Sequence, residues 1–144
     1  MKKNKLKITA KDFKNKKYNA EKRKKYDNKE SKLQQTCIKW FDLQYPQYSQ
    51  ILFSVPNGGK RNVVTASIMK KEGVRRGVLD IFFAKCILKE NAFKIGLFIE
   101  IKTKDGKLSK EQKEFIKKVE AEGFKCEICR SLDEFMKVIN EYLK

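Results

Sequence analysis

The chain has 144 residues, 40% of them hydrophobic, which suits one domain with its own core rather than two domains. Its 35 Lys and Arg residues outnumber 18 Asp and Glu residues, so the formal net charge is +17. A positive field of this size favours a polyanionic partner, because each neutralised phosphate releases counterions. The sequence has no histidine, which excludes histidine general bases, histidine-dependent triads and histidine-ligated metals.

The N-terminal segment is the most basic part of the sequence. Residues 1–29 contain 13 Lys and Arg residues against 3 Asp and Glu residues. A coding bias toward lysine could raise the first count, but it would not explain why acidic residues fail to keep pace. Since the segment lacks sustained periodicity, we predict a flexible or weakly helical basic arm over residues 1–27 and a folded domain over residues 28–144. The arm should add non-specific affinity for nucleic acid that salt weakens.

Hydrophobic periodicity and turn residues predict the order α, β, α, β, β, α, β, α after the arm. Apolar residues at helical spacing predict a first helix from about residue 28 to about Gln44, ahead of Pro46. Ser109 and Gln112 form a capping-box pattern that opens a later helix. The other expected elements are a strand at 51–55, a turn at 56–59, a helix at 62–73, two neighbouring strands or a hairpin at 78–88 and 93–103, a strand at 124–129 and a last helix after Ser131.

The four cysteines bear on compartment and on metal binding. The basic residues 1–7 are not followed by an apolar stretch, and no apolar run is long enough to span a bilayer, so we expect no membrane association and a cytoplasmic, reducing setting. Cys126-x-x-Cys129 falls in a predicted strand, which favours two buried or half-buried thiols. The alternative is a structural zinc site, for which Cys37 and Cys86 would have to supply ligands from distant segments.

Three charged residues interrupt the most apolar strands of the sequence: Asp80, Glu100 and Lys102, here called the charged trio. Side chains alternate along a strand, so Glu100 and Lys102 share a face while the apolar residues between them point into the core. An unpaired charge is costly there, so each group must be neutralised, paired or bound to metal. Lys102 could simply pair with Glu100 or Asp80. One carboxylate would remain in excess, which Mg²⁺ would neutralise, and the spacing alone leaves both interpretations open.

The wider pattern around the charged trio resembles the PD-(D/E)xK nucleases and, more narrowly, the VRR-NUC family of virus-type replication–repair nucleases. Leu79 departs from the family by standing where proline is usual, which leaves the metal site in place but could shift the turn and the basic loop. Five features carry the resemblance, in order and over about residues 29–143: Glu30 followed by Gln34, the turn Pro56-Asn57-Gly58-Gly59, Gly73 with Gly77-Val78-Leu79-Asp80, Glu100-Ile101-Lys102, and Leu108-Ser109-Lys110-Glu111-Gln112.

The resemblance implies an α/β, restriction-endonuclease-like fold with a mixed central sheet flanked by helices. It implies that Asp80 and Glu100 bind Mg²⁺ or Mn²⁺, with the backbone carbonyl of Ile101 as a further oxygen ligand. Lys102 would orient or help to deprotonate the attacking water and offset charge on the phosphate.

Three further side chains are implied near the metal. Glu30 would be an outer or second metal ligand, and Gln34 a neighbour that holds water or a ligand in place. Gln112 would lie near the metal as a catalytic residue. Two of these three residues also have a purely structural interpretation. Glu30 in a first helical turn also favours the helix dipole, and Gln112 also serves as the capping partner of Ser109. For Gln112 the capping role is compatible with a catalytic position.

Contacts to nucleic acid are expected from the turn and from the basic loop before Asp80. The alternatives are a plain turn and solvated surface charges. The candidates are Asn57, Gly58 and Gly59 through backbone amides, and Lys60, Arg61, Arg75 and Arg76 through side chains.

The expected function is that of a small standalone, virus- or phage-type member acting in the host cell: a metal-dependent DNA endonuclease. The resemblance implies action on branched, Holliday-junction-like DNA in DNA repair. It also implies a homodimer, because a domain with one site needs two copies to cut both strands. The alternatives are a nuclease for flap, single-stranded or duplex DNA, and a non-catalytic basic DNA-binding module whose carboxylates are structural.

Overall fold

The computed structural model describes residues 29–56, 63–89 and 92–144. The predicted arm (residues 1–27), the turn residues Asn57, Gly58 and Gly59, and the basic residues Lys60 and Arg61 lie outside the described residues. Residues 29–44 form the first helix. It is followed by η1 (Pro46–Ile51), β1 (Leu52–Ser54), α2 (Val63–Lys71), β2 (Ile81–Phe83), β3 (Ile87–Lys89), β4 (Ala92–Lys94), β5 (Leu97–Ile101), α3 (Lys110–Ala121), β6 (Lys125–Cys129) and α4 (Leu132–Leu143).

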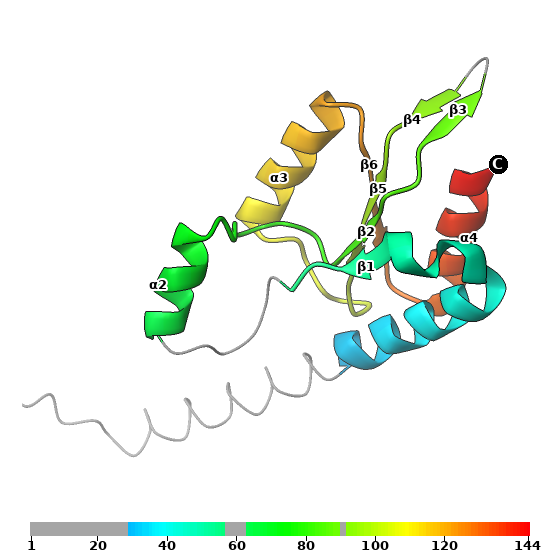
Figure 1. Ribbon diagram of the computed structural model, residues 1–144. Helices are drawn as coiled ribbons and strands as arrows, with labels where there is room; N and C mark the ends of the chain where they lie inside the picture. The colour runs from blue at the N-terminus through cyan, green and yellow to red at the C-terminus, as the bar shows by residue number, and fades with distance from the viewer. Residues whose placement is uncertain (1–28, 57–62, 90–91) are drawn as a thin grey trace, which may run out of the picture.

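The central sheet has four strands in the order β1-β2-β5-β6 (Figure 1). β1 pairs antiparallel with β2, β2 pairs antiparallel with β5, and β5 pairs parallel with β6. The sheet is therefore mixed, as predicted. β3 and β4 form a separate antiparallel hairpin, which continues from the end of β2 and leads into the start of β5.

The two long strands predicted at 78–88 and 93–103 are each divided in the structure. The first becomes β2 and β3, and the second becomes β4 and β5, with Gly96 in the second gap. A Cβ atom on Gly96 would lie 2.9 Å from the ring of Phe82, so the chain can pass this ring only without a side chain. Asp80 was predicted inside a strand but lies directly before β2, where its carbonyl accepts a hydrogen bond of 2.8 Å from the Val55 amide.

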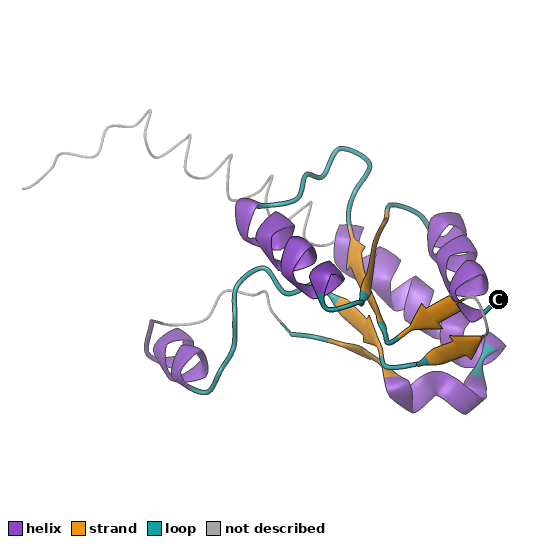
Figure 2. Cartoon of the chain, turned by 90° about the horizontal axis from the view of Figure 1, so that it is seen from above, coloured by secondary structure: helices purple, strands orange, loops and turns teal. Residues whose placement is uncertain are grey.

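One face of the sheet is covered by the first helix and by α4, with α3 on the opposite side (Figures 1 and 2). The apolar residues at helical spacing in the first helix include Leu33, Cys37 and Phe41. They face this core, and Cys37 and Phe41 are completely buried. Burial of this apolar surface is the main force that holds the two helices on the sheet. The other core side chains come from the strands and α4: Leu52, Ile81, Phe83, Ile87, Leu97, Ile99, Ile101, Cys129, Phe135, Ile139 and Tyr142.

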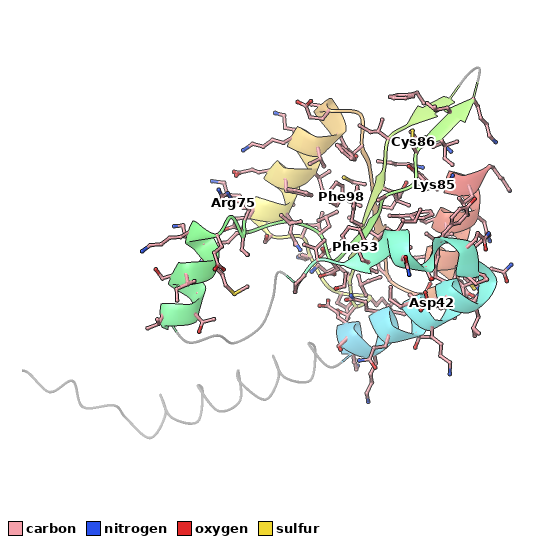
Figure 3. All side chains as sticks on the ribbon, in the orientation of Figure 1. Asp42, Phe53, Arg75, Lys85, Cys86 and Phe98 are labelled. Atoms are coloured by element: carbon pink, nitrogen blue, oxygen red, sulfur yellow. The ribbon has the colours of Figure 1, made fainter. Side chains whose placement is uncertain are left out.

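The opposite face of the sheet carries a row of aromatic side chains from neighbouring strands. Phe53 lies opposite Phe82, and Phe82 lies opposite Phe98. Phe98, which is labelled in Figure 3, meets Phe115 of α3 edge to face, with ring centroids 5.1 Å apart. This contact docks α3 on the sheet. Both views show α2 apart from the other helices (Figures 1 and 2). Each helix within the described ranges is too short or too polar to cross a lipid bilayer.

Candidate active site

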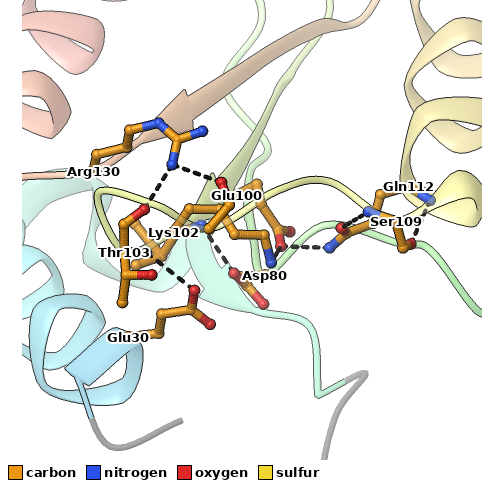
Figure 4. Close-up of polar contacts among 10 residues, drawn as sticks. Glu30, Asp80, Glu100, Lys102, Thr103, Ser109, Gln112 and Arg130 are labelled. Atoms are coloured by element: carbon orange, nitrogen blue, oxygen red, sulfur yellow. Dashed lines mark hydrogen bonds and ion pairs between the residues drawn. The ribbon is translucent and has the colours of Figure 1, made fainter. Parts of the chain in front are cut away.

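The charged trio converges at one end of the central sheet (Figure 4). Asp80 directly precedes β2, Glu100 lies in β5, and Lys102 directly follows β5. These positions meet because β2 and β5 are antiparallel, so the start of one lies beside the end of the other. The carboxylate of Asp80 is fixed by the Ile101 amide, which donates to Oδ2 over 2.9 Å. Ile101 thus contacts the site through its amide, and the metal-binding role that the resemblance implies for its carbonyl stays a prediction.

Glu100 is the most constrained member of the charged trio. Its side chain is 1% exposed, and its Oε1 atom lies 2.5 Å from Nζ of Lys102. The same Oε1 also accepts a hydrogen bond from Nε2 of Gln112. Oε2 is buried and has no hydrogen-bond donor among the described residues. A buried carboxylate oxygen without a partner is costly, so this atom marks a position where a cation would be stabilising.

Burial raises the pKa of both carboxyls of the charged trio above the ordinary value. The charge of Asp80 raises the pKa of Glu100 further, and the charge of Glu30 does the same for Asp80. Burial lowers the pKa of Lys102, but its hydrogen bond to Glu100 and the nearby carboxylates outweigh burial, so the pKa is raised overall. Lys102 is therefore protonated at neutral pH. That state suits a hydrogen-bond donor and positive charge better than a general base.

Gln112 uses both ends of its side-chain amide. Its side-chain Oε1 accepts a hydrogen bond from the backbone amide of Ser109 over 2.9 Å. In return, the backbone amide of Gln112 donates to Ser109 Oγ over 3.1 Å, which confirms the predicted capping box. Its Nε2 donates to Glu100. One side chain thus closes the first turn of α3 and fixes the orientation of a carboxylate in the sheet.

The first helix brings Glu30 to the edge of the site. Glu30 Oε1 accepts a hydrogen bond of 3.1 Å from the Thr103 amide, directly after Lys102. Gln34, one turn further along, donates to Ser54 Oγ of β1 over 3.1 Å. The structure therefore brings Glu30 to the site through the loop after β5, while Gln34 contacts the neighbouring strand.

The donor atoms suit a hard divalent cation. Two carboxylates meet at the sheet end, and one of their oxygens is buried without a partner. In the part of the chain that the structure describes, no three Asp, Glu or Cys side chains are close enough to form a fuller set of ligands. Mg²⁺ accepts this situation, because it commonly takes one or two carboxylates and keeps several waters.

The cysteines are placed as thiols within the fold. Cys126 is half-buried and Cys129 is buried, both in β6, while Cys37 is buried and Cys86 is exposed. Burial raises the pKa of Cys126 and Cys129 to about 12. Among the described residues, which include all four cysteines, no three Asp, Glu or Cys side chains are gathered closely enough to hold a metal ion, so the structure does not bring the thiols together as a zinc site requires.

The loop between β5 and α3 is held by a residue that the sequence did not single out. Nη1 of Arg130 donates to the carbonyl of Thr103 over 2.6 Å (Figure 4). The same atom also donates to the carbonyls of Gly106 over 2.8 Å and Lys104 over 3.3 Å. The one available signal was position: Arg130 directly follows β6, and β6 runs parallel to β5, so the two strands end side by side.

The basic loop before Asp80 packs against the start of α3. A Cβ atom on Gly77 would lie 2.4 Å from the carbonyl oxygen of Glu111, so there is no room for a side chain. Gly77 also has φ 85°, a backbone conformation that favours glycine. Arg76 is exposed. The pKa of Glu111 is lowered mainly by hydrogen bonds to the backbone and to Ser109, and the positive charge of Arg76 lowers it further. Arg75 is also exposed but donates to the Lys70 carbonyl over 3.2 Å, beside α2 (Figure 3). Of the two arginines, Arg76 is the one associated with the helix that carries Gln112.

Comparisons with known proteins agree with this architecture. Residues 14–133 match the family model of the VRR-NUC domain. A solved structure described as a "VRR_NUC domain protein" has a TM-score of 0.65 and 22% sequence identity, and the match covers 79% of this chain and 87% of that one. At that identity the likeness establishes the fold. No curated protein matches the chain. Because the family model covers most of its length, the chain belongs to the VRR-NUC family and has that family's nuclease-type fold.

Proposed function

We propose that this protein is a divalent-metal-dependent endonuclease that hydrolyses phosphodiester bonds in DNA. The observation that carries the proposal is the buried Oε2 of Glu100, which has no donor among the described residues and lies in a cluster with Asp80 and Lys102. A purely structural ion pair would leave no reason for a second carboxylate at the same point. The net charge of +17 supports a polyanionic substrate.

Asp80 and Glu100 would hold Mg²⁺ or Mn²⁺, and the cation would supply Lewis acidity at the scissile phosphate. The Ile101 amide keeps Asp80 in place, and Gln112 fixes the orientation of Glu100. Lys102, protonated and 14% exposed, would donate to the attacking water or a phosphate oxygen and offset the charge that grows there.

Further contacts complete the proposed site. One oxygen of Glu30 is bonded to the Thr103 amide, so its other oxygen is the one suited to an outer or second metal contact. The carbonyl of Ile101 remains a candidate further ligand, with Gln34 a supporting neighbour. Arg76 and Arg75 are proposed phosphate contacts, together with the basic arm over residues 1–27.

The proposed substrate is branched, junction-like DNA, cut by a homodimer. One copy of the charged trio per chain supports this, because paired nicks in opposite strands need two sites and an isologous dimer supplies them. Sedimentation velocity tests the dimer, and a cleavage panel on four-way junction, flap, single-stranded and duplex DNA tests the substrate. A monomer, or equal cutting of all four DNAs, would contradict this part of the proposal.

The activity itself is tested with wild type, Asp80→Asn and Lys102→Met in Mg²⁺ and in Mn²⁺. We expect the wild type to cut and both variants to bind DNA without cutting. Lys137→Met is the matched control, because Lys137 is an exposed lysine of α4 paired with Glu141 at 3.9 Å. It should cut like the wild type. Calorimetric titration with Mn²⁺ should show weaker metal binding by Asp80→Asn. A wild type that binds DNA but never cuts with any divalent ion would refute the proposal.

A further inference from the structure

The residue that follows Lys102 is held from two directions. On one side, Thr103 donates its amide to Glu30 over 3.1 Å. On the other, its carbonyl accepts from Nη1 of Arg130 over 2.6 Å, and Arg130 also reaches the carbonyls of Lys104 and Gly106. The start of the loop over residues 103–106 is therefore bonded through both its amide and its carbonyl.

Arg130 is itself anchored at the beginning of α4. Its amide donates to Glu134 Oε2 over 2.7 Å, and Glu134 donates its own amide to Ser131 Oγ over 3.2 Å. The residue before it, Cys129, accepts a hydrogen bond of 3.0 Å from the Lys102 amide. Cys129 and Arg130 thus hold the two consecutive residues Lys102 and Thr103.

Arg130 directs its charge to backbone oxygens. None of the ion pairs within 4.0 Å among the described residues involves Arg130. All three bonds come from Nη1, whose two hydrogens can serve the carbonyls of Thr103 and Gly106, while the longer contact with the Lys104 carbonyl shares one of them. The bonds to Thr103 and Gly106 are part-buried. The Gly106 amide donates to the Thr103 carbonyl over 2.9 Å, and Arg130 adds a second donor to that carbonyl and a donor to the carbonyl of Gly106.

We propose that Arg130 is a positioning residue for Lys102: it fixes the loop over residues 103–106 so that the ammonium stays against Glu100 and toward the substrate phosphate. The inference rests on the proposed nuclease function. A charged group that must meet a transition state loses much of its effect when it moves by about 1 Å, with losses of about 100-fold in rate. Arg130 itself need not contact the DNA.

The test compares Arg130→Met and Arg130→Lys with wild type in single-turnover cleavage at saturating enzyme and in DNA binding without metal. We expect Arg130→Met to cut about 10–100-fold more slowly, with an unchanged dissociation constant for DNA. Arg130→Lys should recover part of the rate. The control is Lys125→Met, which removes one positive charge from the opposite end of the same strand, where Lys125 pairs with Glu127 at 3.1 Å. It should leave the saturated rate unchanged.

A second measurement does not depend on cleavage. Hydrogen exchange of the amides over residues 102–106 should be faster in Arg130→Met than in wild type and unaffected in Lys125→Met. Unchanged exchange and an unchanged cleavage rate in Arg130→Met would overturn the inference. So would a loss of DNA affinity with an unchanged saturated rate, since Arg130 would then be a phosphate contact.

The two proposals can fail separately. A wild type that never cuts refutes the nuclease, and the exchange experiment still decides whether Arg130 holds the loop. If Arg130→Met does not fold, Arg130→Lys decides: a reduced saturated rate with unchanged affinity supports positioning, and full wild-type rate and exchange overturn it.

Discussion

Removing the positive charge of Lys102 should destabilise the domain, whereas removing the negative charge of Asp80 should not. Lys102 is 14% exposed and Glu100 is 1% exposed, so Lys102→Met leaves a buried carboxylate without its partner. We expect a loss of about 3 kcal/mol, the lower end of the range for breaking a buried pair, because Lys102 keeps some solvent contact. For a domain of this size, that loss lowers Tm by about 10 °C.

The opposite expectation for Asp80 follows from linkage. Its pKa is raised by burial and by Glu30, so the folded state disfavours the ionised form. A carboxyl with a raised folded-state pKa contributes stability at low pH, and that stability is lost as pH rises through this pKa. At neutral pH without metal, Asp80→Asn should therefore unfold at the wild-type temperature or above it. The asparagine oxygen can still accept from the Ile101 amide.

The assay is thermal unfolding at neutral pH, with and without Mg²⁺ or Mn²⁺. Metal at about 100 times its dissociation constant should stabilise the wild type by about 2.7 kcal/mol, and Asp80→Asn by much less. The double variant Lys102→Met with Glu100→Gln should be more stable than Lys102→Met alone, because no unpaired buried charge remains. A metal-free Asp80→Asn that unfolds as early as Lys102→Met would refute the reasoning and make the carboxylate structural.

Three further outcomes are expected. Gln112→Glu should keep the helix cap but replace the donor to Glu100 with another carboxylate. We expect cleavage to fall by about 10-fold or more while the circular dichroism spectrum is unchanged. Wild-type activity would contradict this. Gly77→Ala should cost more stability in urea than Gly73→Ala by about 1–3 kcal/mol, because both have positive φ but only Gly77 meets backbone atoms; equal losses would contradict the contact. Burial raises the pKa of Asp80 and Glu100, so on acidification both carboxyls should take up protons, and metal affinity should decline, at a pH above the ordinary carboxyl range. Calorimetric metal titrations over a series of pH values measure this. A decline only within the ordinary range would contradict it.

The elements of the fold were predictable wherever one face had to be buried. Helical spacing in the first helix and the core-facing positions of Leu97, Ile99 and Ile101 in β5 follow from a core that excludes water, and these residues are buried in it. Glu100 is also buried, although it lies on the other face of the strand. Strand ends were not predictable, because they depend on contacts between segments far apart in sequence. Gly96 divides a predicted strand owing to the ring of Phe82, which no local pattern reveals. The boundary between arm and domain stays a prediction.

Whether a residue of the site could be predicted from the sequence depended on the kind of group that it contacts. The charged trio stood out because charges in apolar strands are rare, and Gln112 because a capping box has a fixed spacing. Arg130 did not, because its partners are carbonyls that every residue has, 27 positions earlier in the chain for Thr103. The sequence spacing also could not distinguish which carboxylate pairs with Lys102, and the structure shows that it is Glu100.

The parallel pairing of β5 with β6 has a consequence for how the protein is made. During synthesis, Asp80, Glu100 and Lys102 leave the ribosome before β6 exists, so β5 lacks one neighbour and the loop after it lacks Arg130. Such non-local pairings form late, once both partners are present. A nascent or truncated chain that lacks β6 would therefore contain the charged trio without its final arrangement. The charged trio would reach its final arrangement only after β6 and α4 have been made and have packed on the sheet.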